Sequence, residues 1–435
     1  MNDTTTADPN RKTDPPAAAE SGAQHLPGFK ARRSLVLMLI FVAYLFCYVD
    51  RMVMSTTIPY IGKELQLSKT AMGMVMSAFF VGYTALQIPG GILVDRFGPR
   101  IIMTVAFAVW SVFTGVTGMV VSFGQMLIAR VLFGVGEAPF PAASMKSIAL
   151  WYEPSKRATA TSVILSSNAL GPAIAPLLAV AIMAHWGWRG TFYSLVLPGI
   201  LVAILIAKYV TDDPFGALAK GAAASGTASS QAETVQYSFW QVLKEPAVWK
   251  STIMFFIANI AGWGFKSWLP TYLVSARHMD MKTMGVTASL PFFAGIVGYL
   301  FGGWLSDGRF KDDRRIPVII FQLVTALFFY LMFTVQSIGL LVVYQTVAGF
   351  FLTAMLAATW ALPVSAVSKK ITGRAVGIFN TGGQLAGLLS PTIIGYLVDV
   401  SKGSFNSSFI FMIGCLLVAS AISLTLKTKP SEADR

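Results

Sequence analysis

Charge is scarce in this sequence of 435 residues: Asp, Glu, Lys and Arg together make up 12% of it, whereas hydrophobic residues make up 55%. A water-soluble domain of this length needs more charge to cover its surface, so the composition excludes one. The apolar residues form continuous runs of about twenty residues rather than alternating ten-residue strands. The chain is therefore expected to cross a membrane many times as α-helices.

Cysteine and histidine are scarce as well, with two and three residues. Cys47 and Cys415 lie in apolar runs without metal-ligand spacing, so we interpret them as packing residues and expect neither a disulfide nor a metal site. The histidines lie in the N-terminal segment or in short loops, which makes them poor proton carriers at mid-membrane. No nucleotide-binding loop or catalytic triad is recognisable, so we expect no cofactor, no use of ATP and no enzyme or sensor activity.

The net charge is +13, from 33 basic and 20 acidic residues. In a soluble protein this balance would suggest a nucleic-acid partner. In a membrane protein it follows from the gathering of Lys and Arg in cytoplasmic loops. The basic residues fall in alternate loops, which predicts both termini in the cytoplasm of a bacterial inner membrane. The expected partner is the lipid bilayer, with no nucleic acid.

Two sets of six apolar runs are predicted to span the membrane. They are residues 35–57, 70–94, 101–121, 125–150, 158–185 and 190–210, then 248–274, 284–305, 316–335, 339–367, 375–399 and 405–426. The predicted fold class is an all-α polytopic membrane protein with twelve transmembrane helices in two six-helix bundles. The predicted organisation is a disordered cytoplasmic tail, a first bundle, a Gly- and Ser-rich cytoplasmic linker, a second bundle and a short cytoplasmic tail, at residues 1–33, 34–211, 212–247, 248–427 and 428–435.

Two charged hairpins interrupt the apolar sequence at equivalent places. The first contains Asp95, Arg96 and Arg100, and the second contains Asp307 and Arg309. The two aspartates are 307 − 95 = 212 positions apart, close to half of the chain, which indicates a parallel repeat of six helices. These charges either fix the topology alone or act as gates, bonding to the opposite half only when the hairpin side is closed.

Four ionisable residues lie inside apolar runs: Asp50, Arg51, Arg130 and Glu137. Each costs about 3 kcal/mol even on the most lenient insertion scale, so each needs a partner or a function. Adjacent helical residues point about 100° apart, so Asp50 cannot simply neutralise Arg51, and Arg51 is expected to face a cavity. Glu137 in an apolar setting should be able to carry a proton. The alternative is a permanent ion held by Arg130 or Arg51 through water.

Several short motifs together resemble the major facilitator superfamily and, within it, the anion:cation symporter family of hexuronate, aldonate, glucarate and related carriers. The resemblance extends from Leu35 to Leu426. The motifs are residues 48–51 (YVDR), 87–91 (QIPGG), 130–139 (RVLFGVGEAP), 187–189 (GWR) and 268–273 (WLPTYL), with the hairpin at 90–100 matching the superfamily's signature loop.

This resemblance implies roles for the candidate residues. Arg51 would bind a substrate carboxylate, and Asp50 and Glu137 together would couple transport to protons. Arg130, nearer the start of its helix, is expected to contact backbone carbonyls or Asp50 rather than substrate, and we group it with the gating and structural charges. Substrate contacts are implied for three further positions: Tyr83, Asn168 and Asn380.

Helical spacing adds neighbours to this set. Tyr48 lies beside Arg51, Gln87 follows Tyr83 by one turn, and Gln384 follows Asn380 by one turn. Any of these side chains could instead only pack or tie helices together. Lys266 departs from the family pattern, which is apolar at this position. It either extends to the outer surface or supplies a second cation to the cavity, which would favour a doubly charged substrate.

The sequence therefore predicts a secondary transporter that imports a small organic anion with protons by alternating access, and we expect a monomer. The amides and phenols favour a hexuronate or aldonate. An exchanger or facilitator of dicarboxylates or aromatic acids is the alternative within the transporter class.

Overall fold

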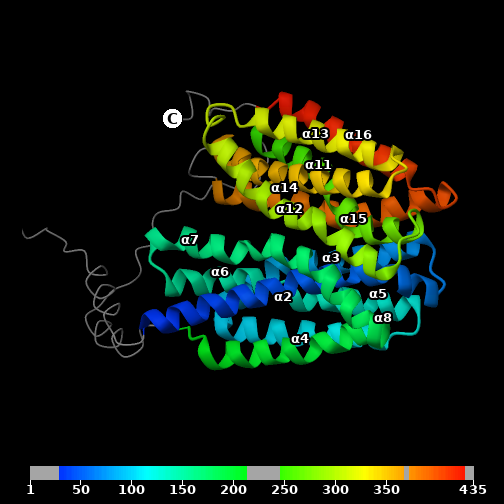
Figure 1. Cartoon of the computed structure of the whole chain (residues 1–435). Helices are drawn as coiled ribbons and strands as arrows, with labels where there is room; N and C mark the ends of the chain where they lie inside the picture. Colours follow the sequence, from blue (N-terminus) through cyan, green and yellow to red (C-terminus); the bar gives the residue numbers. More distant parts are fainter. Residues whose placement is uncertain (1–28, 213–244, 367–371, 427–435) are drawn as a thin grey trace, which may run out of the picture.

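Helices make up the part of the chain that the structure describes, which comprises residues 29–212, 245–366 and 372–426 of a computed structural model. In chain order they are α2 (Phe29–Glu64), α3 (Lys69–Phe97), α4 (Pro99–Met119), α5 (Phe123–Glu137), α6 (Phe140–Trp151), α7 (Pro154–Leu165), α8 (Ser167–Tyr209), α11 (Pro246–Ser275), α12 (Met281–Asp307), α13 (Arg315–Thr334), α14 (Ile338–Ala366), α15 (Thr372–Val400) and α16 (Asn406–Leu424). Figure 1 shows them in two groups, α2 to α8 below and α11 to α16 above. The predicted linker and tails lie almost wholly outside the described residues, so the domain boundaries remain predictions.

Ten helices of the described residues are long and apolar enough to cross a membrane. One of them, Ser155–Tyr209, contains two predicted spans, because the backbone at Gly187 leaves the helical region with φ 63° and ψ −177°. Helix α11 is not among the ten, yet its 30 residues exceed the roughly 20 needed to span. With these two segments the predicted fold class is confirmed.

The fourth predicted span, residues 125–150, is not one continuous helix in the structure. It is broken into α5 and α6 between Glu137 and Phe140. Pro139 lies in the break, where its ring removes a backbone donor and clashes with the preceding turn. Glu137 is therefore the last residue of α5 rather than part of an unbroken helix.

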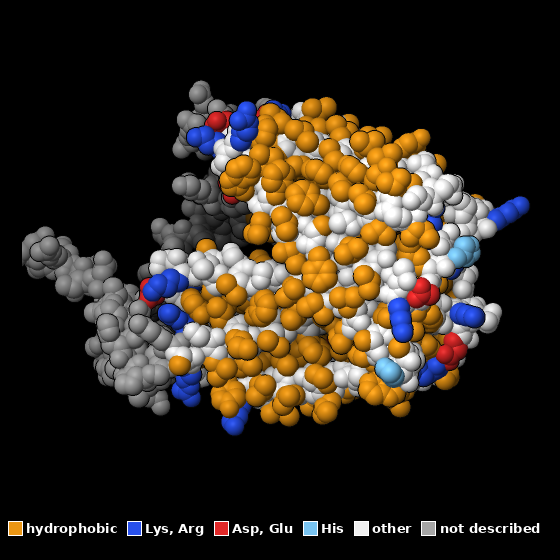
Figure 2. Space-filling view, viewed as in Figure 1, with side chains coloured by type: hydrophobic (Ala, Val, Ile, Leu, Met, Phe, Trp, Pro, Cys, Tyr) orange, Lys and Arg blue, Asp and Glu red, His pale blue; other side chains and the backbone are white. Residues whose placement is uncertain are grey.

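The exterior has the pattern of a lipid-facing surface. Figure 2 shows hydrophobic side chains over the middle of the molecule and most Lys and Arg side chains at its two ends. Large apolar side chains such as Ile88, Leu197 and Leu300 are 80%, 77% and 70% exposed. A surface of this kind is stable in hydrocarbon rather than in water.

We call the end that holds the turn at Gly98, between α3 and α4, the hairpin end. The opposite end, where α2 finishes and α3 begins at Lys69, is the far end. In Figures 1 and 2 the hairpin end is on the left, and the surface in Figure 2 is recessed there between the two groups of helices.

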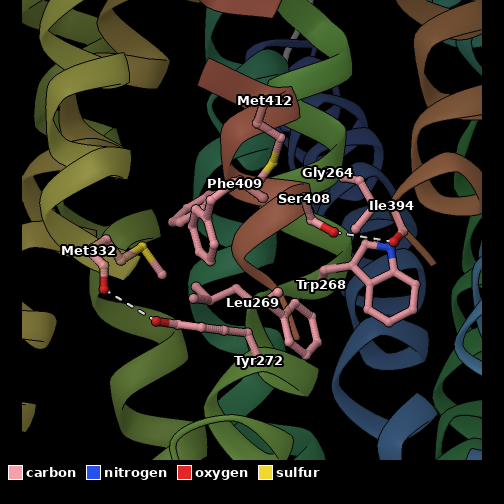
Figure 3. A pocket seen from close by; sticks show the side chains of 11 residues that line it. Gly264, Trp268, Leu269, Tyr272, Met332, Ile394, Ser408, Phe409 and Met412 are labelled. Carbon is pink, nitrogen blue, oxygen red and sulfur yellow. Dashed lines mark hydrogen bonds between the residues drawn. The ribbon is translucent and has the colours of Figure 1, made fainter. Parts of the chain in front are cut away.

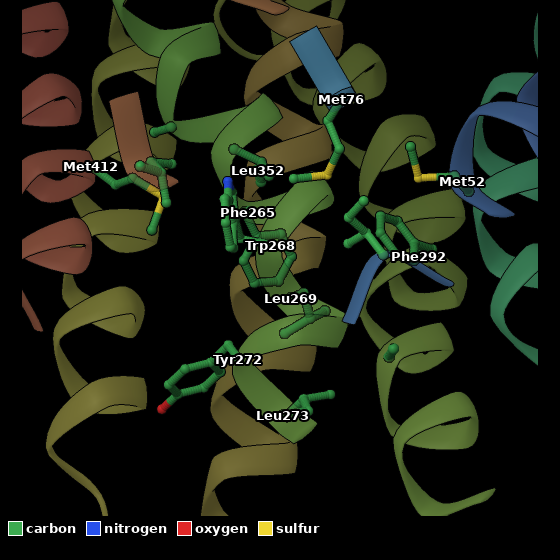
Figure 4. Close-up of a cluster of buried hydrophobic side chains, with 14 of the residues drawn as sticks. Met52, Met76, Phe265, Trp268, Leu269, Tyr272, Leu273, Phe292, Leu352 and Met412 are labelled. Carbon is green, nitrogen blue, oxygen red and sulfur yellow. The ribbon is translucent and has the colours of Figure 1, made fainter. Parts of the chain in front are cut away.

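The two halves meet between mid-depth and the far end. A continuous apolar cluster crosses from one half to the other and includes Met52 and Met76 of the first half and Phe265 and Phe292 of the second (Figure 4). Close backbone contact accompanies it: a Cβ at Gly73 of α3 would lie 2.3 Å from the carbonyl oxygen of Pro391 in α15. Only glycine fits at such a helix crossing.

Asp399 of α15 closes the far end by capping α3 from the opposite half. Its carboxylate accepts hydrogen bonds from the backbone N–H of Lys69 at 3.0 Å and of Thr70 at 2.7 Å, and from the Thr70 hydroxyl at 2.6 Å. These N–H groups have no partner within their own helix, and the positive end of the helix dipole attracts the carboxylate. One side chain thereby joins the two bundles.

At the hairpin end the acidic side chains bond within their own half. Asp95 pairs with Lys146 of α6 at 2.8 Å, and Asp307 pairs with Arg314 at 3.0 Å. Arg100 donates to the carbonyl of Ala207 at 2.8 Å and attaches the hairpin to the end of α8. Arg96 lies over the ring of its neighbour Phe97 at 5.3 Å, and Arg309 is exposed. The gating role of these charges remains a prediction.

Candidate carboxylate-binding site

The site begins with an unusually close approach of α3 to α5. A Cβ at Gly82 would lie 2.0 Å from the carbonyl oxygen of Val131, and one at Gly134 would lie 2.1 Å from that of Phe79. Each helix thus presents a glycine to the other's backbone, which lets the axes come close. As a result, the aromatic side chains of α3 lie beside the charged residues of α2 and α5.

Arg51 and Glu137 form the central ion pair. Arg51 Nε donates to Glu137 Oε1 at 2.9 Å, and the Nη2 atom of the same guanidinium contacts the same oxygen. The side chain of Arg51 is 9% exposed and that of Glu137 is fully buried. Because leaving one such charge uncompensated costs about 3–5 kcal/mol, neither residue can lose its partner without a replacement.

Aromatic rings surround the Arg51 guanidinium. Its Cζ lies 4.6 Å from the ring centroid of Phe79, 4.8 Å from that of Tyr83 and 5.5 Å from that of Tyr48. Stacking on ring faces keeps the planar group oriented without neutralising it. Two of these rings, Tyr48 and Tyr83, were candidates in the sequence, and the structure brings both to Arg51.

Asp50 points away from Arg51 and toward α4. Its Oδ2 accepts a hydrogen bond from the hydroxyl of Thr114 at 3.1 Å. Its other oxygen is buried and has no hydrogen-bond partner among the described residues, and the same is true of Glu137 Oε2. Each carboxyl group therefore has one bonded oxygen and one that is available to carry a proton.

Arg130 is buried, and its Cζ lies 4.5 Å from the ring centroid of Phe133 and 5.8 Å from that of Phe79. It interacts electrostatically with Asp50 and Glu137, but its Nε has no hydrogen-bond partner in the described chain. Its expected contact with backbone carbonyls is not among the hydrogen bonds of the described residues. The structure instead places Arg130 on the wall of a cavity.

That cavity is small and lies between the halves. Its wall is formed by α2, α3 and α5 on one side and α11 on the other, through Arg51, Met52, Met54, Ser55, Met76, Phe79, Phe80, Arg130, Trp263 and Ser267. Two arginines on a mainly apolar wall suit an anion, because the low dielectric strengthens their attraction and apolar neighbours exclude water.

Lys266 of α11 is not among the residues that line this cavity, but it follows Trp263, which does, by three residues. Its Nζ is 5.3 Å from the ring centroid of Trp263, and its charge interacts with that of Arg51 across the boundary between the halves. A contact between Lys266 and substrate remains a prediction.

The remaining polar candidates lie outside the group of residues that line this cavity. Gln87, Asn380 and Gln384 are half-buried, and Asn168 is exposed at the start of α8. Gln384 Oε1 is buried without a partner among the described residues. Their contact with substrate remains a prediction.

A second small cavity lies within the second half, and its wall contains none of the predicted site residues (Figure 3). Its wall is apolar apart from groups that bond to backbone carbonyls: Tyr272 to Met332 at 3.2 Å and Ser408 to Ile394 at 3.3 Å. With these polar groups already satisfied, this cavity offers no charge to an anion.

Sequence reasoning missed several neighbours of the charged residues, including two that form hydrogen bonds with the carboxyl groups. Cys47, interpreted as a packing residue, donates from its thiol to Glu137 Oε1 at 2.7 Å. It precedes Arg51 by four residues, so the i, i+4 rule could have placed it on the same face. No local sequence pattern could have identified Thr114 as the partner of Asp50, because the two residues are 64 positions apart in the sequence.

Comparisons with known proteins agree with this architecture. The model of the Major Facilitator Superfamily matches residues 40–321 and 281–435. The chain is 31% identical to the hexuronate transporter of Bacillus subtilis, over 88% of this chain and 92% of that protein. It is 30% identical to a probable galactarate/D-glucarate transporter of Escherichia coli, over 88% of this chain and 91% of the relative.

Among solved structures, the chain resembles a bacterial homologue of the human lysosomal transporter Spinster in an inward-facing, unoccupied conformation. The TM-score is 0.79 at 19% identity, covering 91% of this chain and 97% of that one, which shows the fold. With a family model matching nearly the whole chain, the predicted resemblance is confirmed: this multi-pass membrane protein belongs to the Major Facilitator Superfamily of transporters and resembles its sugar-acid carriers.

Proposed function

We propose that the protein imports a small organic anion together with protons, by alternating access across a bacterial inner membrane with both termini in the cytoplasm. The observation that carries this proposal is the buried ion pair between Glu137 and Arg51, of which Arg51 lines a cavity between the two halves. The hairpin end would then face the cytoplasm and the far end the periplasm.

The pair supports proton coupling because the substrate and Glu137 compete for one guanidinium. Arg51 keeps its proton at any physiological pH and binds a carboxylate with two parallel hydrogen bonds. When Glu137 accepts a proton, its negative charge disappears and Arg51 is free to bind a substrate carboxylate. When Glu137 loses the proton, it reclaims Arg51 and expels the substrate.

Asp50 is the second proton site in this scheme. It lies next to Arg51 in the sequence but bonds to Thr114, so its protonation changes the charge of the site without directly breaking the Arg51 pair. Protonation of both carboxyl groups from the periplasm, capture of the anion, reorientation of the halves, release and deprotonation complete the cycle.

The substrate class is proposed to be a sugar acid. The relatives named above are hexuronate and probable galactarate/D-glucarate transporters, so similarity supports acids of this size with either one or two carboxyl groups. The phenols of Tyr48 and Tyr83 lie beside Arg51 and suit a hydroxyl-rich molecule. From these groups alone we favour a hexuronate or aldonate.

Uptake of labelled D-glucuronate into proteoliposomes tests this function. An inward proton gradient should accelerate uptake in the natural protein, and Glu137→Gln should lose this acceleration while still exchanging substrate. Lys250→Met, a change at the start of α11, is the control. Uptake that neither responds to the gradient nor changes in Glu137→Gln would contradict symport and support the exchanger alternative.

A further inference from the structure

Two cationic side chains line the central cavity and a third lies beside it, which is more positive charge than a single carboxylate requires. Arg51 and Arg130 line it from the first half, and Lys266 approaches from α11 of the second half. Of these three cations, only Arg51 has a carboxylate partner within ion-pair distance among the described residues. Arg130 is 3% exposed, and its Nε has no hydrogen-bond partner among the described residues.

The position of Lys266 on its helix explains why its charge reaches the cavity. Trp263, three residues before it, contributes to the cavity wall, and residues three apart share a face of a helix, so Lys266 projects from α11 beside the cavity. Its ammonium group is held near the Trp263 ring and interacts with the Arg51 charge. A second positive charge beside Arg51 is unfavourable unless a negative group lies nearby.

The charges around the cavity favour a doubly charged substrate over a singly charged one. Arg51, Arg130 and Lys266 contribute three positive charges, which Asp50 and Glu137 offset only when they are ionised. Both carboxyl groups are protonated at substrate capture in the proposed function, so the three positive charges are then uncompensated. A monoanion neutralises one of them, whereas a dianion neutralises two.

We propose that the transported anion carries two acidic groups, one bound by Arg51 and the other by Lys266, and is therefore a sugar diacid or a dianion of similar size. This inference rests on the proposed function. It replaces the preference for a hexuronate or aldonate, which considered the neutral polar residues and not the number of cations.

The proposed binding mode also links the two halves. Arg51 belongs to α2 and Lys266 to α11, so a diacid that bonds to both spans the boundary between the bundles. A monoacid bonded to Arg51 alone leaves the charge of Lys266 unpaired. Two acidic groups thus favour the closed, loaded state in which the halves reorient.

The test compares two acids that differ at one carbon, D-glucarate with two carboxylates and D-gluconate with one. Binding to the purified full-length protein is measured by calorimetry, and uptake is measured in proteoliposomes. The natural protein should bind D-glucarate about tenfold more tightly than D-gluconate, or better, because a charge-assisted bond is added. Lys266→Met should abolish this preference mainly by weakening D-glucarate binding.

Two further variants make the result specific. Lys266→Arg keeps the charge and should retain most of the preference. Lys250→Met, on the same helix but near the hairpin end, should leave both affinities unchanged. Equal losses for both acids in Lys266→Met, or an unchanged ratio of affinities, would overturn the proposal.

The outcomes also separate this proposal from the proposed function. If the natural protein transports D-gluconate or D-glucuronate with protons and shows no preference for D-glucarate, symport stands and the second acidic site is refuted. If no sugar acid moves with protons but D-glucarate still binds through Lys266, the site stands and the symport mechanism fails.

Discussion

The acidic side chains at the two ends of the molecule form different kinds of contact. At the far end, Asp399 of the second half caps α3 of the first half through three hydrogen bonds. At the hairpin end, Asp95 and Asp307 each pair with a base of their own half. The first arrangement joins the bundles and the second does not. This difference indicates that one end is closed by interactions that the other end lacks in this conformation.

Alternating access requires that the two ends exchange these states. We therefore expect the far-end contacts to stabilise the described conformation and the hairpin aspartates to stabilise the opposite one. Each prediction below alters one end and leaves the other unchanged.

The largest effect is expected from Asp95→Asn. The amide cannot supply the negative charge that the closed hairpin end is expected to need at a helix terminus or an arginine of the other half, so uptake should fall about tenfold or more. Substrate affinity measured by calorimetry should change little. Asp312→Asn, at an exposed aspartate of the same end, is the control. Full uptake by Asp95→Asn would show that the hairpin charges only fix topology.

Asp399→Asn should have the next largest effect. Weakening a charged helix cap costs about 1 kcal/mol, enough to shift the population toward opening of the far end about fivefold. The shift is measurable as faster labelling of Ser55→Cys, a cavity residue, by a membrane-impermeant thiol reagent, with Cys415→Ser in the background. A labelling rate equal to that of the parent would contradict the role of Asp399 in closure.

Thr392→Val should act in the same direction with a smaller effect. The Thr392 hydroxyl bonds to the Ser77 hydroxyl at 2.9 Å across the halves, and a neutral hydrogen bond contributes about 1 kcal/mol or less. The same labelling assay should give an increase below that of Asp399→Asn. An increase above it would mean that the apolar contacts around Thr392, rather than the Asp399 cap, control closure.

Lys146→Met should have the smallest effect. Its ion pair with Asp95 is partly exposed, with 35% and 79% of the two side chains accessible, and such pairs contribute about 0–1 kcal/mol. Because Asp95 is then free for the opposite half, uptake should stay within about twofold of the parent or rise slightly. The change should vanish when Asp95→Asn is also present. A rise in uptake that persists in the double variant would show that Lys146 acts independently of Asp95.

The fold was predictable because each spanning helix is a local pattern. The apolar runs identified the segments, and the spacing of Asp95 and Asp307 identified the two halves. The break between α5 and α6 could also have been predicted from the sequence, since Pro139 disfavours a continuous helix. The reading of residues 125–150 as one helix gave more weight to hydropathy than to this proline.

The candidate site was predictable in its members but not in their pairing. Arg51, Asp50, Arg130 and Glu137 were identifiable because charges in apolar runs are costly. The direct bond between Arg51 and Glu137 was not, because it depends on how closely α2 approaches α5. The position of Lys266 likewise depends on how α11 faces α2 across the two halves, which no local pattern encodes.

The central claim is that Glu137 and the substrate carboxylate exchange places at Arg51, so that binding is coupled to proton uptake. Calorimetric titration with D-glucarate at one pH, in buffers of different ionisation enthalpy, measures the protons taken up on binding. The natural protein should take up close to one proton more per substrate than Glu137→Gln does. Identical proton uptake by the two proteins would contradict the exchange at Arg51.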